Sequence, residues 1–256
     1  MPAEQQADKK PWRGRVFAGK FATASQPFVY RPLTAPQGRK EIRLLKLFAH
    51  SGRENGVLKG TLDHVSLVDE PDYETLSYAW GHSSARKKIL LDNRVLLVPA
   101  SAVSALHRMR LKGEDRVLWI DSVCINQADT AERNAQVAAM ADIYSKGRRN
   151  LVWLGHISTK STAFMQSFYK IMKNIGDETD NYERLEEVVF DESRGFRLSG
   201  SGLPDDIDLR PVMKVFGSAW FRRLWVAQEA MLARCSSCSC GLDLELPLEN
   251  LLTVAM

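Results

Sequence analysis

Residues 117–136, VLWIDSVCINQADTAERNAQ, decide the fold that this chain can adopt. Residues 117–120 form an uninterrupted apolar run, the pattern of a strand covered on both faces, and Asp121 closes the run with a carboxylate. Asp129 and Glu132 then have the spacing of a capping box, which predicts the start of a helix. The stretch therefore predicts a strand, a polar loop and a helix, and polar groups at such a junction are typical of a ligand site.

The same pattern continues after this helix. Four apolar residues are spaced to lie on one helical face, namely Val137, Met140, Ala141 and Tyr144. Residues 150–154, NLVWL, form a second apolar run that ends at Gly155. Strand, helix and strand within this span are typical of a parallel crossover unit. The sequence thus predicts an α/β fold with a mainly parallel central sheet flanked by helices.

Upstream segments predict β-hairpin additions on the N-terminal side. Residues 42–48 and 60–67 have strand-like character across a polar turn that contains glycine. Residues 86–91 and 95–98 flank Asp92-Asn93, a dipeptide suited to a hairpin turn.

Between and after these hairpins, the sequence predicts core elements. Residues 73–80 are expected to form the first core strand, ending at Gly81. Residues 101–111 are expected to form a helix with Ser101 as a possible N-cap. The helix would connect the first strand group to the strand at 117–120.

The C-terminal half is less regular. Residues 161–175 predict a helix, and residues 176–204, acidic and then rich in Ser and Gly, predict a surface insertion. Strong helix formers fill residues 220–233. Residues 244–254 predict a C-terminal appendage of a strand or turn and a short helix. The sequence then stops without an obvious cap, which favours a natural protein that continues past Met256.

Length and composition bound the class of protein. A chain of 256 residues with 45% hydrophobic residues can bury a full core, and we expect a leader at 1–27 and a single domain at 28–256. The net charge is +4, but basic residues are dispersed, which argues against a nucleic-acid partner. No apolar run approaches a membrane span and no signal sequence precedes the domain, so a cytoplasmic location is expected.

The four cysteines favour reduced thiols rather than disulfides. Cys124 stands alone, whereas Cys235, Cys238 and Cys240 lie within six residues. Zinc binding by this trio would need a fourth ligand, and none stands at a familiar spacing, so no metal is expected. For Cys124, a buried structural thiol is favoured over a nucleophile, because none of the five histidines has a recognisable partner spacing.

Four segments together resemble the fungal heterokaryon-incompatibility (HET) domain. In order they are YETLSYAWG at 73–81, LWIDSVCINQ at 118–127, ERNAQVAAMADIY at 132–144 and WFRRLWVAQE at 220–229. The resemblance runs from about residue 42 to residue 252. It implies a fungal protein of allorecognition, whose domain triggers programmed cell death when incompatible hyphae fuse.

A more distant resemblance is to the Toll/interleukin-1 receptor (TIR) domain, which has a flavodoxin-like fold. It is carried by Ser77-Tyr78, a strand ending at Asp121, a strand at 151–154, and Trp225 followed four residues later by Glu229. In enzymatic TIR domains the glutamate of a Trp-x-x-x-Glu element cleaves NAD+. The resemblance implies an NAD+ glycohydrolase (NADase) with Glu229 as catalytic residue and NAD+ as substrate, so no cofactor is expected. The insertion at 176–204 departs from the TIR pattern.

Physical reasoning assigns roles around this glutamate. If 220–233 is one helix, Arg222, Trp225 and Glu229 share a face. The carboxylate would stabilise an oxocarbenium-like ribose, an arginine (Arg222 or Arg223) would meet the pyrophosphate, and the indole would stack on a base. The remaining candidates for substrate binding lie at the carboxyl ends of predicted strands and in the loop after them: Ser77, Tyr78, Trp80, Asp121, Asn126 and Gln127.

Each candidate also has a structural interpretation. Glu229 can pair with an arginine on a solvated helix face, and Trp220 and Trp225 can be core residues. Asp121 can cap a turn, Asn126-Gln127 can satisfy loop backbone, and capping alone explains Glu132. The alternative function is a non-enzymatic death-signalling module that acts by self-association or by docking an incompatibility partner.

Overall fold

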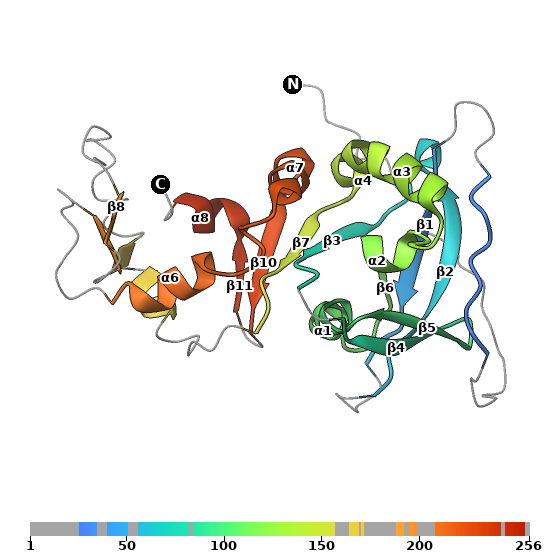
Figure 1. The fold of residues 1–256 in the computed structure, drawn as a ribbon, viewed down its shortest axis with the longest axis horizontal. Helices are drawn as coiled ribbons and strands as arrows, with labels where there is room; N and C mark the ends of the chain where they lie inside the picture. The colour runs from blue at the N-terminus through green and yellow to red at the C-terminus, as the bar shows by residue number, and fades with distance from the viewer. Residues whose placement is uncertain are drawn as a thin grey trace, which may run out of the picture.

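The computed structural model describes residues 26–34, 40–50, 56–81, 84–156, 164–168, 170–171, 188–191, 195–198, 208–241 and 244–253. These residues form an α/β fold around a nine-stranded sheet with helices on both faces (Figure 1). The strands, in sheet order, are β11 (Leu244–Pro247), β10 (Ser236–Cys240), β7 (Asn150–Trp153), β3 (Glu74–Tyr78), β6 (Arg116–Trp119), β1 (Glu41–Leu47), β2 (Lys59–Ser66), β4 (Arg86–Leu91) and β5 (Arg94–Pro99).

The centre of the sheet is parallel, and its margins contain antiparallel pairs and one further parallel pair, β2–β4. Strands β6, β3, β7 and β10 are neighbours in this order and pair in parallel. Numbered along the chain, these four strands have the order 2-1-3-4, which is the flavodoxin-like order. By contrast, β1 pairs antiparallel with both β2 and β6, and the margins β4–β5 and β10–β11 are also antiparallel. The sheet is therefore mixed. The hairpins β1–β2, β4–β5 and β10–β11 are antiparallel because strands joined by short turns can pair only in this way.

Both predicted hairpins are present. Asp92 and Asn93 connect β4 to β5 with φ angles of 50° and 61°, the positive values that a tight hairpin turn requires. The amide of Phe28 donates to the carbonyl of Val95 in β5, and the amide of Val95 donates to the carbonyl of Gln26. The domain therefore already includes Gln26 and Pro27, inside the predicted leader, whose residues 1–25 lie outside the described residues.

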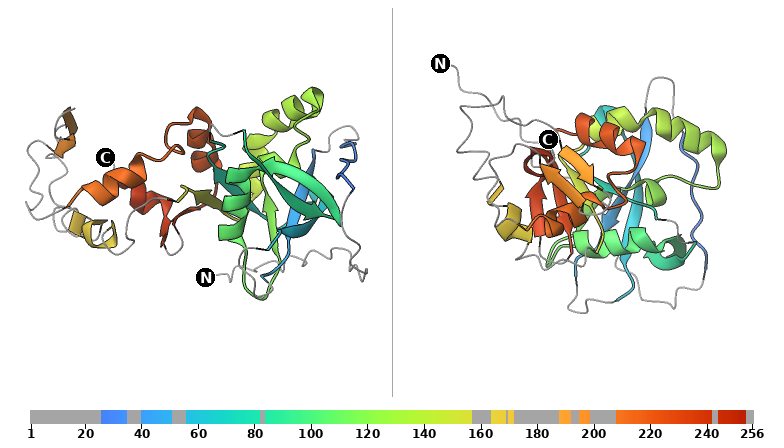
Figure 2. Two further views of the ribbon diagram at one scale, coloured as in Figure 1. Left: turned by 60° about the horizontal axis from the view of Figure 1, so that its bottom comes forward. Right: turned by 60° about the vertical axis from the view of Figure 1, so that its left-hand side comes forward.

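Helices cover the two faces of the sheet. They are α1 (Ala100–Met109), α2 (Asp121–Cys124), α3 (Thr130–Ala138), α4 (Met140–Lys146), α6 (Arg210–Phe216), α7 (Leu224–Leu232) and α8 (Leu248–Thr253), with a short 3-10 helix η1 (Leu67–Asp69). Helices α4 and α7 contact each other, and α1 lies on the opposite side of β3 (Figures 1 and 2). None of the helices in these described ranges is both long and apolar enough to cross a membrane.

Three helix predictions need correction. Ser101 is not the N-cap of α1, since the helix already begins at Ala100; its hydroxyl donates instead to the carbonyl of Trp80, at 2.7 Å. The helix expected after Asp129 is two helices that meet at Ala139. Because of this break the four apolar residues do not share one buried face: Met140 and Tyr144 are buried, but Val137 is exposed.

The helix expected over 220–233 is the third case. Residues 218–222 form turns and α7 begins only at Leu224, after Arg223 in an extended conformation. Arg222 therefore lies outside α7, and helical periodicity does not align it with Trp225 and Glu229.

The remaining C-terminal predictions agree where the chain is described. Residues 164–168 and 170–171 are helical, as predicted, and β11 with α8 forms the predicted appendage. Within the predicted insertion at 176–204, β8 (Val188–Asp191) and β9 (Gly195–Leu198) pair as a separate two-stranded sheet. The rest of the insertion lies outside the described residues.

Buried apolar side chains form two clusters on one continuous sheet. The first cluster packs around β1, β3, β6, α1 and α4, and the second around α6, Trp220, Val226 and α8. Strand β7 belongs to both, since Leu151 and Trp153 pack in the first cluster and Val152 in the second; Leu154, directly after the strand, also packs in the second. Strand β7 thus connects the two clusters.

Candidate functional site

The candidate site lies at the carboxyl ends of β3 and β6. In a sheet of this order, strand connections diverge on either side of β3, and ligands bind outside the carboxyl ends at such a position. Ser77 comes from β3, Asp121 follows β6 at the start of α2, and Glu229 comes from α7. Residues far apart in sequence are therefore brought together here.

Glu229 is buried at this position rather than solvated. Its side chain is 3% exposed, and its carboxylate accepts a hydrogen bond from the hydroxyl of Ser77. Ser77 in turn accepts a hydrogen bond of 2.7 Å from the indole nitrogen of Trp220. The hydroxyl of Tyr144 also lies against Glu229; burial first, and then the charge of Glu229, raises the pKa of Tyr144. The interpretation of Glu229 as a partner of arginine on a solvated face is therefore wrong.

Asp121 is a second carboxylate beside Glu229, and it is only half-buried. Oδ2 accepts a hydrogen bond of 2.8 Å from the indole of Trp80, and Oδ1 accepts one of 2.6 Å from the amide of Ser122. Burial raises the pKa of Asp121 to about 6, and the negative charge of Glu229 adds to this, against the hydrogen bond from Trp80 and the charge of Arg223. A carboxyl group with this pKa exchanges protons near neutral pH.

The arginine that reaches the site is Arg223. It immediately precedes α7, its guanidinium donates to the carbonyl of Tyr78, and its charge acts on Asp121. Arg222 is exposed and lies outside the helix. The expected common face of Arg222, Trp225 and Glu229 is therefore wrong, because only the last two are helical.

The two tryptophans of this segment have different environments. Trp220 is 1% exposed and packs in the second cluster, as the core interpretation predicts. Trp225, in the first turn of α7, is 52% exposed, so the core interpretation is wrong for this residue. Leu224 and Met231, on the same helix, are also strongly exposed.

The loop after β6 is held by its own polar groups. Gln127 donates from Nε2 to the carbonyl of Asp121 at 2.9 Å, and Asn126 accepts from the amide of Ala128 at 3.3 Å. Tyr78 is buried, and its backbone carbonyl is the part that meets Arg223. Since adjacent residues of a strand point to opposite faces, the Tyr78 ring lies on the face opposite the Ser77 hydroxyl. Tyr78 and Ser77 thus share an edge of the sheet but not a face.

Glu132 has a structural role that the capping box explains only in part. Its amide donates to Asp129, as predicted, but its carboxylate binds Arg43 instead of returning to the helix start. The same carboxylate accepts a hydrogen bond of 2.7 Å from the amide of Asn126. Sequence reasoning missed Arg43 and Tyr144. For Arg43 a signal existed, because a single arginine within the apolar run of β1 must be paired when that strand is buried.

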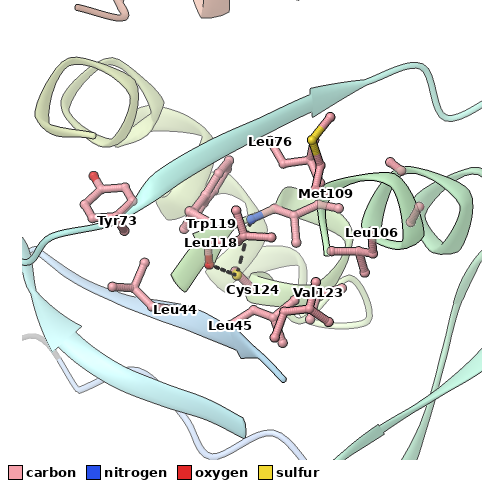
Figure 3. Close-up of a cluster of buried hydrophobic side chains, with 14 of the residues drawn as sticks. Leu44, Leu45, Tyr73, Leu76, Leu106, Met109, Leu118, Trp119, Val123 and Cys124 are labelled. Carbon is pink, nitrogen blue, oxygen red and sulfur yellow. Dashed lines mark hydrogen bonds between the residues drawn. The ribbon is translucent and has the colours of Figure 1, made fainter. Parts of the chain in front are cut away.

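The cysteines provide no reactive centre at this site. Cys124 lies within the first apolar cluster near Leu45 and Leu118 (Figure 3), and burial raises its pKa to about 12. The structural interpretation of this thiol is confirmed. Cys238, in β10, is buried, and Cys235, which precedes this strand, is exposed. Among the residues for which the structure gives positions, no three His, Cys, Asp or Glu side chains are grouped as metal ligands.

Comparisons of the sequence with known proteins show to which family this chain belongs. The sequence profile described as "Heterokaryon incompatibility protein (HET)" matches residues 73–229, from β3 to Glu229. "Heterokaryon incompatibility protein 6, OR allele" of Neurospora crassa is 30% identical to this chain in an alignment 255 positions long, and the alignment covers 86% of this chain and 36% of the relative. The chain thus spans about a third of that relative's length. No solved structure matches significantly. Because the profile covers more than half of the chain, the chain belongs to the heterokaryon incompatibility (HET) family.

Proposed function

We propose that this domain is a cell-death effector of fungal non-self recognition, and that it hydrolyses NAD+ at the nicotinamide glycosidic bond. The observation that carries the proposal is the position of Glu229, held by Ser77 and Tyr144 beside Asp121 at the carboxyl ends of parallel strands. The order of the central strands is that of flavodoxin-like folds, the fold of the TIR domains that the sequence resembles. The TIR-like activity itself is part of the proposal.

The chemistry requires a carboxylate near the ribose. Departure of nicotinamide leaves an oxocarbenium-like ribose, and a buried carboxylate stabilises this positive charge more strongly than a solvated one would. Glu229 meets this requirement because its hydrogen bonds and burial fix the carboxylate in place. We assign Glu229 as the catalytic residue.

The neighbouring groups suit the rest of the dinucleotide. Arg223 provides positive charge at the carboxyl edge, where a pyrophosphate would lie, and takes over the role expected of Arg222. Trp225 is half exposed on the same helix and offers a plane for base stacking. Asn126 and Gln127 lie on the loop next to Asp121, where their side chains bond to the loop backbone; in this proposal their remaining polar atoms hydrogen-bond a ribose. NAD+ is the substrate in this proposal, so no further cofactor is invoked.

The cellular setting is proposed from family membership. The Neurospora relative is named as a heterokaryon incompatibility protein, and the chain matches about a third of it. We infer that this domain acts in the cytoplasm, that an incompatibility partner triggers it, and that self-association accompanies its activation.

The experiment is to incubate the purified chain with NAD+ and to measure released nicotinamide by chromatography. We expect turnover by the unaltered chain and a loss of about 100-fold or more in Glu229→Gln, which keeps the size of the side chain. Glu114→Gln makes the same chemical change at an exposed position and should leave turnover unaltered. Absence of turnover at high protein concentration would overturn the proposal.

A second candidate function is a non-enzymatic module that docks a partner. The observation that favours it is the exposed apolar surface of α7, where Leu224 and Met231 are one helical repeat of seven apart. If this surface is an interface, Leu224→Ser with Met231→Ser should abolish concentration-dependent association in sedimentation velocity. An unaltered sedimentation profile would count against this alternative.

A further inference from the structure

We propose that Asp121 is the general base that activates the attacking water, an inference that rests on the NAD+ hydrolysis proposed above. Glu229 would then stabilise the ribose cation, and Asp121 would be a second catalytic residue, not only a substrate-binding one. The inference starts from the presence of two carboxylates in one site with different surroundings.

The chemistry of the leaving group decides what the second carboxylate must do. When the bond between ribose C1′ and the pyridinium nitrogen breaks, its electron pair goes to that nitrogen, and nicotinamide leaves as a neutral molecule. The leaving group therefore needs no proton and the site needs no general acid. The oxygen of water forms the new bond to C1′, and one proton of that water must be taken up and later released to solvent. The products are nicotinamide, ADP-ribose and one proton.

Asp121 has the geometry of such a base. Each of its carboxylate oxygens is fixed by one N–H donor, Trp80 on Oδ2 and Ser122 on Oδ1, and each keeps a lone pair for a water molecule. Gln127 fixes the backbone of the same residue from the following loop. As a whole residue Asp121 is partly exposed, whereas Glu229 is 3% exposed. The carboxylate of Asp121 is thus held in one orientation, as a base must be.

The charges around Asp121 set its pH dependence. The groups that face it are Glu229, Arg223, Tyr78, Tyr144 and Cys124. Burial raises the pKa values of both tyrosines and of the cysteine, so these three stay neutral up to high pH. Glu229 and Arg223 are left as the charged neighbours, and together with burial and the hydrogen bonds they give Asp121 a pKa of about 6. The aspartate is therefore mostly ionised, and able to accept a proton, at pH 7.

The test is a pH profile of NAD+ hydrolysis with matched variants. In the unaltered chain, kcat should rise with pH and level off above about 6. Asp121→Asn, whose side-chain oxygen can still accept the Trp80 hydrogen bond, should lower kcat by about 10²–10⁴-fold with a smaller change in KM, and should lose this rise. Sodium azide, an anion that needs no base, should restore cleavage in Asp121→Asn, with azido-ADP-ribose as product by mass spectrometry. Asp69→Asn, at an exposed position, is the control.

Trp80→Phe provides a test that keeps the aspartate. It removes the hydrogen bond that lowers the pKa of Asp121, so the midpoint of the pH profile should move to higher pH. If the unaltered chain hydrolyses NAD+ but Asp121→Asn keeps its kcat and its pH profile, or Trp80→Phe leaves the midpoint in place, Asp121 is not the base and the hydrolysis proposal stands. If the unaltered chain does not hydrolyse NAD+, both proposals fail.

Discussion

Ser77 connects two residues that come from more than a hundred positions further along the chain. Its hydroxyl accepts from the indole of Trp220 and donates to Glu229, so an apolar core residue fixes the orientation of a buried carboxylate. The position of Glu229 therefore depends on Ser77 and Trp220 together.

Ser77→Ala should reduce both stability and activity. The buried carboxylate of Glu229 would lose a donor, and losing a hydrogen bond to a charged group costs about 1.5–3 kcal/mol. Urea denaturation monitored by circular dichroism measures the free energy of unfolding, and nicotinamide release measures the activity. Ser84→Ala, at an exposed position, should change neither quantity. Unaltered stability of Ser77→Ala would mean that the hydrogen bond contributes nothing.

The two tryptophans should respond differently to truncation. Trp220→Ala removes a fully buried side chain and should cost about 3–5 kcal/mol, whereas Trp225→Ala should cost less than about 1 kcal/mol, since its ring is half exposed. If Trp225 stacks on the substrate, the second variant should raise KM for NAD+ at unchanged stability. Equal losses of stability in the two variants would contradict the placement of α7.

At the scale of elements, one buried arginine joins the N-terminal segment, β1, α2 and α3. Arg43 in β1 donates to the carbonyls of Arg31 and Cys124 and to both oxygens of Glu132, and its guanidinium lies over the ring of Tyr30. Glu132 also accepts from the amide of Asn126. The loop that carries Asn126 and Gln127 is thus held from a strand far from it in sequence.

Single substitutions of this ion pair should be strongly destabilising. Glu132→Gln leaves the guanidinium of Arg43 buried without its counter-charge, and Arg43→Met leaves the carboxylate of Glu132 buried without its counter-charge. Each substitution should lower the free energy of unfolding by about 3–5 kcal/mol. The double variant should lose less than the sum of the two single losses, because it leaves no unpaired charge. Chemical denaturation of all four proteins gives the coupling energy. Additive losses would show that the two side chains act independently.

At the scale of the whole molecule, the central strands carry charged groups at both ends. A cluster of one glutamate and three arginines lies at their amino ends, and the carboxylates of the candidate site lie at their carboxyl ends. Glu74, at the start of β3, is buried between Arg116 of β6 and Arg149 before β7, with Arg148 near by. Burial raises the pKa of Glu74, but the hydrogen bonds and charges of Arg116 and Arg149 outweigh burial and lower it to about 2. This cluster ties three neighbouring strands together.

The sign of this shift predicts how stability depends on pH. Because the folded pKa of Glu74 is below its unfolded value of about 4.5, the stabilisation is full above pH 4.5 and is lost as pH falls toward 2. Glu74→Gln should therefore lower the free energy of unfolding by about 3 kcal/mol at pH 7. The difference in this free energy between the variant and the unaltered chain should shrink below pH 4.5. Urea denaturation of both proteins at several pH values from 7 to 3 measures this difference in the free energy of unfolding. A difference that does not change with pH would exclude this role.

The elements of the fold were largely predictable, because apolar runs, turn dipeptides and the spacing of caps are local signals. The strands around Trp119 and Leu151 and the turn at Asp92-Asn93 are where the sequence predicts them. The break at Ala139 and the late start of α7 were not predictable from helix formers alone, since tertiary packing overrides such weak preferences. For this reason Arg223, and not Arg222, meets the site.

Sequence alone determined the class of this protein: its motifs specify the HET family, and its apolar runs specify buried strands joined by helices. Only the tertiary structure decided which polar groups meet. The contact of Ser77 with Glu229 and the electrostatic coupling of Glu229 to Asp121 join segments that are far apart in the chain. Such contacts depend on strand order and helix placement, which arise from the packing of the whole sheet and leave no local pattern in the residues concerned.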